Sequence, residues 1–452
     1  MNTTLTFCGG AGSVTGANFL LESGEAKFLI DCGSAAQELV CDPINLEAFP
    51  YDPSHISALL VTHAHQDHIG RIPKLVRDGF RGQIHSTSAT RDLSAVMLDD
   101  ALHVLEMETA EHGCEALYDG EDVERARSLW QGHEYHAPFS IGDTTFDFFD
   151  AGHILGSALI RVSRGNRSIV FSGDIGNSPE PLLRDTEIPE ESDYLLVESV
   201  YGDRLHEDRA QRREVLRNVI RATHEKKGTL LIPSFSLERT QVLLFEIHTM
   251  IEAGEIEPIH IYMDSPLAAR VTAIFRSYPA LFNDAARARL EKGEDLFAFE
   301  GLTIVGSTAQ SRAIHSDKSP KVIIAGAGMS AGGRVRAHEL QYLDRRDTTL
   351  LFVGYQAPGT LGRRIQEGAK KVRIEGREVH VRATIETVTG YSGHADRDQL
   401  MDFIERAGRK TKKVFVTMGE PRASLFLAQR IHDFFGIEAY VPQKGERVEL
   451  DF

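Results

Sequence analysis

The pattern of apolar and polar positions divides the chain into three regions. Up to residue 206, short apolar segments such as 4–7, 18–21 and 27–30 are separated by turns rich in glycine, and they predict strands. From 207 to 384, short apolar segments alternate with longer helical patterns, which predicts a parallel sheet with connecting helices. From 385 to 452 the chain again predicts the mixed strands and helices of the first region.

The expected elements of the later regions are placed by residue number. The middle region predicts helices over 209–226, 239–253 and 267–276, and strands over 229–232 and 259–263. The last region predicts strands over 384–388 and 413–417, and helices over 398–407 and 422–435. In the first region, the acidic stretch 111–127 predicts an exposed helical excursion.

Together these elements predict an α/β protein with one domain inserted into another. Residues 1–206 and 385–452 are expected to form a four-layer αββα sandwich, and residues 207–384 to form the inserted parallel α/β domain. We expect substrate to bind in the cleft between the two domains, because clefts at domain junctions are common ligand sites.

The composition limits the cellular compartments in which we expect the protein. Of its 452 residues 42% are hydrophobic, and its apolar runs stay well below the roughly 18 residues that a membrane span needs. The N-terminus lacks the basic start of an export signal, so we expect a cytoplasmic protein with no membrane partner. The four cysteines, Cys8, Cys32, Cys41 and Cys114, show no CxxC spacing, and we expect reduced thiols.

The charge balance is acidic, with a formal net charge of −16 at pH 7. This surplus argues against a general nucleic-acid binder, because counterion release from phosphates needs clustered Lys and Arg. Basic residues do gather at 334–336, 345–346, 363–364 and 370–371. Paired charges of this kind are commonly solvated helix faces, and only Arg334 gains a functional interpretation from its neighbours.

A metal site is predicted by the segment 61–70, which places three imidazoles and a carboxylate within six residues, directly after the apolar run 58–61. Alternate residues of an extended segment point to one side, so His63 and His65 can bind one ion together. Asp67 and His68 would then serve a second ion. The alternative is a polar loop that happens to be rich in histidine, but four ligand-type residues at this spacing favour metal.

Further ligands are expected from the ends of other strands, because two neighbouring ions need more donors than one loop offers. His153 follows the strand-like segment 145–149, and Asp174 ends the apolar segment 168–174. A lone histidine in a glycine-rich turn is more often structural. Polar residues after predicted strands recur, however, at Asp31, His63, His153, Asp174 and Glu198, and this recurrence favours a shared site.

With these residues the sequence resembles the metallo-β-lactamase superfamily, whose HxHxDH signature matches 63–68 and whose downstream His and Asp match His153 and Asp174. Several further segments resemble the β-CASP nucleases of the polyadenylation-cleavage-factor type found in bacteria and archaea. These segments are 198–203, 233–241, 263–268, 326–334, 352–355 and 391–396. The similarity covers nearly the whole chain, from the glycine-rich turn at 8–16 to the last strand.

The resemblance implies a mechanism. His63, His65 and His153 would hold one Zn²⁺, Asp67 and His68 a second, and Asp174 would bridge them, so that a shared water becomes hydroxide at neutral pH. This hydroxide would cleave single-stranded RNA and leave 5′-phosphate and 3′-hydroxyl ends. Asp31 would orient the ligands or the water, although a turn-capping aspartate is the alternative.

A general acid is also implied by the resemblance. His394 would protonate the departing oxygen. Glu198 would hold the His394 imidazole and raise its pKa. Taken alone, His394 would be an ordinary loop histidine. The pairing with Glu198 in the family favours a catalytic role, so both residues join Asp31 and Asp67 as predicted catalytic residues.

A phosphate-binding turn is predicted at 326–333, which follows the apolar segment 322–325 and precedes a helical pattern over 334–343. Backbone N–H groups at Gly332 and Gly333, with the side chains of Ser330 and Arg334, would form an anion cradle. A tight turn that needs glycine geometry explains the segment equally well, and the resemblance favours phosphate. Ser265, in a second matching segment, is a further expected substrate-binding residue.

One departure from the family pattern concerns the second metal. RNA-directed members carry a histidine where this chain has Met418, and a thioether is a poor Zn²⁺ ligand in oxygen-rich surroundings, so the second ion should bind more weakly. A DNA-directed β-CASP nuclease, a small-molecule metallo-hydrolase and a weakly active RNA-binding subunit therefore stay open as alternatives. Endonuclease or 5′–3′ exonuclease action and homodimer formation also stay open.

Overall fold

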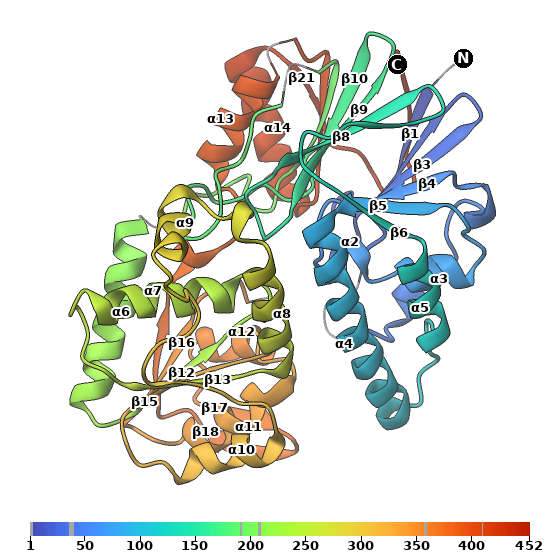
Figure 1. Ribbon diagram of the computed structural model, residues 1–452. Coiled ribbons are helices and arrows are strands. Elements are labelled where there is room, and N and C mark those ends of the chain that lie inside the picture. The colour runs from blue at the N-terminus through green and yellow to red at the C-terminus, as the bar shows by residue number, and fades with distance from the viewer. Residues whose placement is uncertain (1–2, 36–39, 190–191, 207–208, 357–358, 409) are drawn as a thin grey trace. The chain divides into compact units, whose positions relative to one another are not determined.

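The computed structural model describes residues 3–35, 40–189, 192–206, 209–356, 359–408 and 410–452 (Figure 1). The chain forms two compact units. The first unit comprises Met1–Leu205 and His394–Phe452, and the second comprises His206–Gly393. The second unit thus extends beyond the boundary expected at residue 384, because the strand Thr384–Thr387, which we assigned to the returning first domain, pairs with Thr349–Phe352 in the sheet of the second unit.

Two seven-stranded sheets form the centre of the first unit. The first sheet has the order β22-β1-β2-β3-β4-β5-β6, with β1 (Thr3–Gly9), β2 (Asn18–Ser23), β3 (Ala26–Ile30), β4 (Ala58–Leu60), β5 (Gln83–Thr87), β6 (Trp130–His133) and β22 (Arg447–Leu450). The second has the order β21-β20-β11-β10-β9-β8-β7, with β7 (Phe139–Ile141), β8 (Thr144–Asp150), β9 (Ala158–Arg164), β10 (Arg167–Phe171), β11 (Tyr194–Glu198), β20 (Lys413–Thr417) and β21 (Glu438–Tyr440).

The sheets pack face to face, and helices cover their outer sides. Phe28 and Leu60 of the first sheet share a buried core with Phe146 and Phe171 of the second. Leu29, next to Phe28 in β3, points to the opposite face of the sheet and joins the core under the helices. This alternation is the period of two that a strand requires. The helices of this unit are α1 (Pro43–Leu46), α2 (Gln66–Ile69), α3 (Ile72–Arg77), α4 (Ser88–His112), α5 (Gly120–Ser128), α13 (Arg397–Ala407) and α14 (Pro421–Phe435), with a 3-10 turn at Pro53–His55.

These helices complete a four-layer αββα sandwich, which confirms the predicted fold class. Helices α3, α4 and α5 lie along the first sheet and α13 and α14 along the second (Figure 1). Their buried side chains pack against these sheets. In the acidic stretch 111–127, the first two residues end α4 and the chain is helical again from Gly120, where α5 buries Val123 and Ala126 in the core. It is therefore less exposed than we expected.

The second unit contains a six-stranded sheet in which every paired strand is parallel. Its order is β14-β13-β15-β12-β16-β19, with β12 (Thr229–Pro233), β13 (His260–Asp264), β14 (Leu302–Ile304), β15 (Lys321–Ala325), β16 (Thr348–Phe352) and β19 (Thr384–Thr387). A two-stranded hairpin, β17 (Lys371–Ile374) and β18 (Arg377–His380), lies outside this sheet. The predicted parallel α/β arrangement is confirmed.

Helices separate the strands of the second unit. They are α6 (Arg209–Glu225), α7 (Arg239–Glu252), α8 (Pro266–Ser277), α9 (Asp284–Glu291), α10 (Thr308–Ala313), α11 (Gly333–Tyr342) and α12 (Leu361–Gln366), with 3-10 turns at Pro279–Leu281, Ile314–Ser316 and Thr389–Tyr391. Ser265 caps α8 by accepting a hydrogen bond from Ala268 N, and Pro266 occupies the first turn, where its missing N–H costs nothing.

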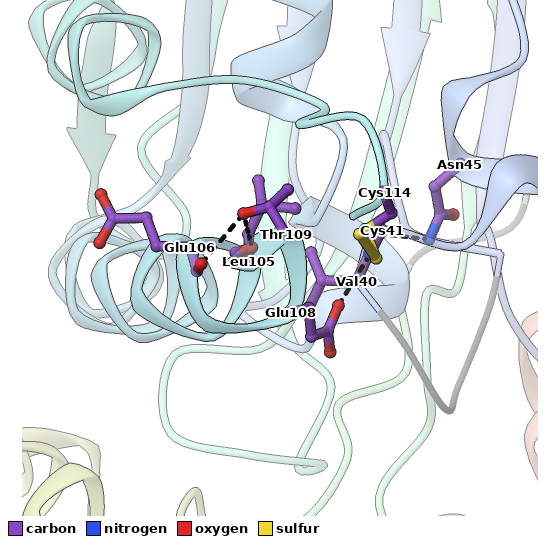
Figure 2. The surroundings of a disulfide bond; sticks show 8 residues. All are labelled: Val40, Cys41, Asn45, Leu105, Glu106, Glu108, Thr109 and Cys114. Carbon is purple, nitrogen blue, oxygen red and sulfur yellow. Dashed lines mark hydrogen bonds between the residues drawn. A yellow bond between two sulfur atoms is a disulfide. The ribbon is translucent and has the colours of Figure 1, made fainter. Parts of the chain in front are cut away.

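The expectation that all four cysteines are reduced is wrong. Cys41 and Cys114 form a disulfide, while Cys8 and Cys32 are buried free thiols. Figure 2 shows the bond beside α4, where Glu108 accepts a hydrogen bond from Cys41 N at 3.0 Å. The two cysteines are 73 residues apart, and it is the long helix α4 that returns the chain to Cys41, so their spacing gives no local signal.

No helix of the described residues is both long and apolar enough to cross a membrane. This finding agrees with the absence of long apolar runs in the sequence.

Candidate metal centre

Donor atoms from three segments of the first unit meet where strands end. His63 Nε2 lies 3.0 Å from His65 Nδ1, which lies 3.2 Å from His153 Nε2. Asp174 Oδ2 lies 3.4 Å from His63 Nε2 and 3.5 Å from His153 Nε2. Four donors placed about 2.0–2.1 Å from a zinc ion in a tetrahedron are about 3.3–3.4 Å from one another. The four atoms therefore fit around one ion.

A second group of donors shares Asp174 with the first. His68 Nε2 lies 3.3 Å from Asp174 Oδ1 and 3.9 Å from Asp67 Oδ2. Both His68 Nε2 and Asp174 Oδ1 are buried and have no hydrogen-bond partner among the described residues. A buried nitrogen facing a buried carboxylate oxygen is costly unless a proton or a metal cation lies between them, so these residues fit a metal ion.

Asp31 and Thr62 contact the Nδ1 atoms of His68 and His63, the ring nitrogens that do not face the other donors. Asp31 Oδ2 lies 2.7 Å from His68 Nδ1 and accepts a hydrogen bond from Thr62 Oγ1 at 2.8 Å, while Asp31 Oδ1 accepts one from Thr62 N at 2.8 Å. Since Thr62 Oγ1 donates to Asp31, it can accept from His63 Nδ1 at 3.1 Å. The protons thus placed on both Nδ1 atoms leave the Nε2 lone pairs of His63 and His68 free for metal.

The strand order explains why these residues meet. β3 and β4 are parallel neighbours in one sheet, and β10, β11 and β20 are parallel neighbours in the other. Asp31 directly follows β3, and Glu198 ends β11, so each lies at the carboxyl end of a buried strand. Parallel strands bring such ends to one edge of a sheet, which is where the sequence predicted the site.

Electrostatics at the site favour neutral imidazoles in the first group. Burial and the neighbouring imidazoles hold the pKa of His63 and of His65 well below the ordinary histidine value. Burial alone would raise the pKa of Asp174, but the facing histidines hold it well below its usual range. Burial alone would lower the pKa of His68, but Asp174 and Asp31 raise it well above its usual value, and a cation at Nε2 would take the place of that proton.

His394 and Glu198 form a pair beside Asp174. His394 Nδ1 lies 3.2 Å from Glu198 Oε1 and 3.8 Å from Asp174 Oδ2. Glu198 is fully buried, and its Oε1 also accepts a hydrogen bond from Ile175 N at 2.7 Å. Burial alone would lower the pKa of His394, but Glu198 and Asp174 raise it to about 9. The imidazole, whose side chain is 24% exposed, can therefore carry a proton at neutral pH.

Met418, at the position of the expected family histidine, is buried. It belongs to the core between the two sheets, and its backbone N donates to Gly10 O at 2.6 Å. A methyl group added to Gly10 would lie 2.5 Å from Met418 Sδ, so the thioether packs closely against the Gly10 backbone.

The predicted phosphate cradle lies in the second unit, at the turn between β15 and α11. Arg334 Nη1 donates to Asp264 Oδ1 at 2.5 Å and to Val305 O at 3.0 Å. Ser330 is fully buried and donates to Glu339. The two side chains expected to bind phosphate are thus engaged within the fold. Gly332 and Gly333 start α11, and Ser265 Oγ lies 3.0 Å from Ser236 Oγ.

Sequence reasoning missed several residues that shape the site. Thr62 orients Asp31 and two histidines, and its only signal was a hydroxyl directly before the metal motif. Gly33 allows the chain to pass the metal loop, because a methyl group there would lie 1.5 Å from Asp67 O. Gly173 has a φ of 52°, and a methyl group there would lie 2.7 Å from Thr62 Cβ. Close approaches of this kind involve residues distant in sequence.

An αββα sandwich that carries imidazoles and carboxylates at its strand ends, with a parallel α/β unit inserted, defines a metal-dependent hydrolase of the metallo-β-lactamase type. Family comparisons agree with this class. The model described as the Beta-Casp domain matches residues 240–365, and that of the Zn-dependent metallo-hydrolase RNA specificity domain matches 378–442. A third, described as anti-Pycsar protein Apyc1, matches 4–198.

Relatives that are similar over nearly the whole chain identify the family within this class of hydrolases. Ribonuclease TTHA0252 of Thermus thermophilus is 36% identical over 98% of this chain and 99% of its own length. The transcription termination factor FttA of Methanocaldococcus jannaschii is 31% identical over 99% of this chain and 71% of its own length. The chain belongs to the β-CASP family of metallo-β-lactamase-fold ribonucleases.

A solved structure shares the fold. The crystal structure of a protein of unknown function from Enterococcus faecalis aligns over 100% of both chains with a TM-score of 0.59 and 13% sequence identity. At this identity the similarity bears on the fold alone.

Proposed function

We propose that this protein hydrolyses phosphodiester bonds of single-stranded RNA with two zinc ions, leaving 5′-phosphate and 3′-hydroxyl ends. One observation carries the proposal. The buried Asp174 carboxylate directs Oδ2 toward His63 and His153, at 3.4 and 3.5 Å, and Oδ1 toward His68 at 3.3 Å. A carboxylate that faces two groups of donors is suited to bridge two ions, and such ion pairs are typical of phosphodiester hydrolysis.

His63, His65 and His153 would hold the first ion, Asp67 and His68 the second, and Asp174 both. When bound, the ions would lower the pKa of a coordinated water toward 7 and neutralise charge that develops on the phosphate. Asp31 would fix the ring of His68 from behind, through the 2.7 Å contact to Nδ1. Because Met418 offers a thioether packed in the core, the second ion would bind more weakly than the first.

His394 would act as the general acid. The Glu198 carboxylate holds its Nδ1 at 3.2 Å, which leaves Nε2 to present a proton. Hydrolysis to a 5′-phosphate breaks the bond between phosphorus and the 3′ oxygen, and the proton from His394 would go to that oxygen as it departs. Positioned proton transfer of this kind contributes typically about 10²–10⁴-fold in rate.

A substrate panel tests this proposal. The zinc-replete protein would be incubated with single-stranded RNA, single-stranded DNA and a small thioester, beside the variant His394→Gln. We expect cleavage of RNA, 5′-phosphate ends in the products, and a loss of about 10²–10⁴-fold in rate for the variant with its zinc content unchanged. Cleavage of DNA or thioester in preference to RNA would contradict the substrate class, and an unchanged rate for His394→Gln would contradict the assigned acid.

DNA is the main competing substrate, because Met418 departs from the pattern of RNA-directed members. The homodimer and the cytoplasmic location expected from the sequence stay predictions.

A further inference from the structure

Phe235 presents an exposed aromatic ring at one edge of the second unit's sheet. It follows β12 after Ser234, and it is 41% exposed. The other exposed large apolar side chain among the described residues of this unit is Ile304 at the end of β14. Since β14 and β12 are three strand positions apart in the sheet order, the two side chains are separated by about 14 Å. Ile304 is therefore too far from the ring to form an apolar patch with it.

The ring is held in place by the glycine-rich turn beside it. A methyl group added to Gly328 would lie 2.7 Å from Phe235 Cδ2 and 2.8 Å from Cε2, so the ring rests directly on the glycine backbone. A methyl group at Gly354 would lie 3.8 Å from Cε2. The backbone of Phe235 is fixed as well, because its carbonyl accepts hydrogen bonds from Thr240 N at 3.3 Å and Thr240 Oγ1 at 2.8 Å.

Two serine hydroxyls lie at the same edge of the sheet as this ring. β12, β13 and β15 are parallel, so the turns that follow them lie at the same edge of the sheet. There the hydroxyls of Ser236 and Ser265 lie 3.0 Å apart. A methyl group at Gly326 would lie 3.5 Å from the first hydroxyl and 3.8 Å from the second. The carboxyl edge of parallel strands is the usual ligand-binding edge of such a sheet.

Arg334 and Glu339, two charged groups of this edge, are already engaged within the fold. Arg334 is bound to Asp264, and Ser330 to Glu339, as described above. With a formal net charge of −16, the chain also lacks the general positive charge of proteins that bind nucleic acid through phosphates. This edge also offers the flat apolar face of Phe235 and the hydroxyls of Ser236 and Ser265. A nucleobase has the matching chemistry, since its faces are apolar and its edges form hydrogen bonds.

We propose that Phe235 stacks on a nucleobase of the RNA strand and that Gly328 is required so that the ring can take its place. This inference rests on the proposed ribonuclease function and adds a residue that binds the RNA substrate directly. Stacking tolerates any base, so Phe235 would contribute affinity without sequence preference. Aromatic stacking is worth about 1–3 kcal/mol per base, which corresponds to about 5- to 150-fold in affinity.

The test compares variants at this edge by fluorescence anisotropy with labelled single-stranded RNA. All carry His394→Gln and zinc, so that the strand stays intact during the measurement. Phe235→Leu keeps an apolar side chain but removes the ring, and we expect its Kd to rise about 5- to 150-fold. Phe235→Tyr should bind as the parent does. Gly328→Ala, which keeps the ring but displaces it, should resemble Phe235→Leu. Ile304→Ala is the matched control and should leave the Kd unchanged.

An RNA series with a single abasic position moved along the strand gives a second readout. One abasic position should weaken binding by the parent and leave Phe235→Leu unaffected, because the stacking partner is already missing. In cleavage assays of the chain with His394 intact, Phe235→Leu should raise KM and leave kcat unchanged. Circular dichroism and thermal unfolding would establish that each variant is folded.

The outcomes separate this inference from the function on which it rests. If the parent binds RNA and Phe235→Leu binds it equally well, or if no abasic position distinguishes the two proteins, the stacking role is wrong and the ribonuclease stands. If the parent neither binds nor cleaves RNA, the proposed function fails and the stacking role fails with it.

Discussion

The two carboxylate oxygens of Asp174 face different imidazoles, and this one residue therefore couples the two candidate metal sites. The Asp31 carboxylate lies behind this arrangement, where it contacts His68 and accepts hydrogen bonds from Thr62. The site thus has an inner group of donors and an outer carboxylate that fixes the orientation of one donor. The difference between these two roles can be measured by substitution.

For Asp31 we predict that Asn weakens metal binding without abolishing it. The amide oxygen can still accept a hydrogen bond from Thr62 N, but the NH₂ group cannot accept one from His68 Nδ1. The His68 ring therefore loses its fixed orientation. Removal of an outer partner of this kind typically costs about 10–100-fold in metal affinity. Competition with a chelator of known zinc affinity would measure the change. Asp52→Asn, in an exposed turn, is the control, and equal zinc affinity in both variants would refute the role of Asp31.

Glu339 provides a prediction on pH. Burial raises the pKa of this carboxyl to about 8, against the weaker opposing effects of its hydrogen bond with Ser330 and of Arg336. In the unfolded chain the group ionises near its ordinary value of 4.5, so between about pH 4.5 and 8 the folded state holds one more proton than the unfolded state. Stability attributable to this group is therefore fully present at low pH and falls as pH rises through this window.

Replacing Glu339 with Gln should remove that slope, since the amide does not ionise and can still accept from Ser330. We expect the free energy of unfolding of the variant to exceed that of the parent by a margin that grows with pH, by at most about 1.4 kcal/mol per pH unit up to about pH 8. Urea unfolding at pH 5.5, 7 and 8 would measure this margin. A margin that stays constant over this range would show that Glu339 is ionised in the folded protein.

At this scale, residue type and spacing indicated much of the candidate site. The segment 63–68 predicted a metal loop because four ligand-type residues follow an apolar strand, and the structure places all four near Asp174. Thr62 and Gly33 could not be found in this way. Their roles depend on contacts with Asp31 and Asp67, which the fold brings together from other segments.

Among the elements, the described residues that follow β3 contact the metal loop, and those near Cys41 contact the residues that follow β3. Cys32 N donates to His68 O at 2.8 Å, and Ser34 N donates to Gln66 O at 2.9 Å. Asn45 Oδ1 accepts from Ala35 N at 2.8 Å, close in sequence to the disulfide at Cys41. Hydrogen bonds to the metal loop therefore hold Cys32 and Ser34, and a hydrogen bond to Asn45 holds Ala35.

Removal of the disulfide should destabilise the first unit. The bond joins residues 73 positions apart, and closing a loop of this length in the unfolded chain stabilises the folded state by about 4 kcal/mol. We expect Cys114→Ser to lower the free energy of unfolding by that order. Urea unfolding with and without a phosphine reductant would measure the effect. The reductant should destabilise the parent and leave Cys114→Ser unchanged, and a parent insensitive to the reductant would contradict the disulfide's contribution.

The elements themselves were largely predictable, but their partners were not. Predicted helices at 239–253 and 422–435 correspond to α7 (Arg239–Glu252) and α14 (Pro421–Phe435). The strand near residue 384 was also found, yet it was assigned to the wrong unit. Local apolar pattern shows that a strand forms, whereas its neighbour in a sheet depends on long-range pairing, here with β16.

For the whole molecule, the negative net charge makes the metal centre important for RNA binding. A chain with a formal net charge of −16 repels a polyanion unless local features overcome that repulsion. Divalent cations held by the donors around Asp174 would supply positive charge where the scissile phosphate must lie, and Phe235 would add affinity that needs no charge. Metal removal should therefore impair RNA binding as well as cleavage.

The central claim is that two metal ions, held around Asp174, are required for RNA cleavage. The most direct measurement is a titration of the chelator-stripped protein with zinc, in which bound zinc per chain and the rate of RNA cleavage are followed together. We expect no cleavage by the stripped protein and a rate that rises as bound zinc approaches two per chain, the second ion binding more weakly. An unchanged cleavage rate without bound metal, or no cleavage when both sites are filled, would contradict the account.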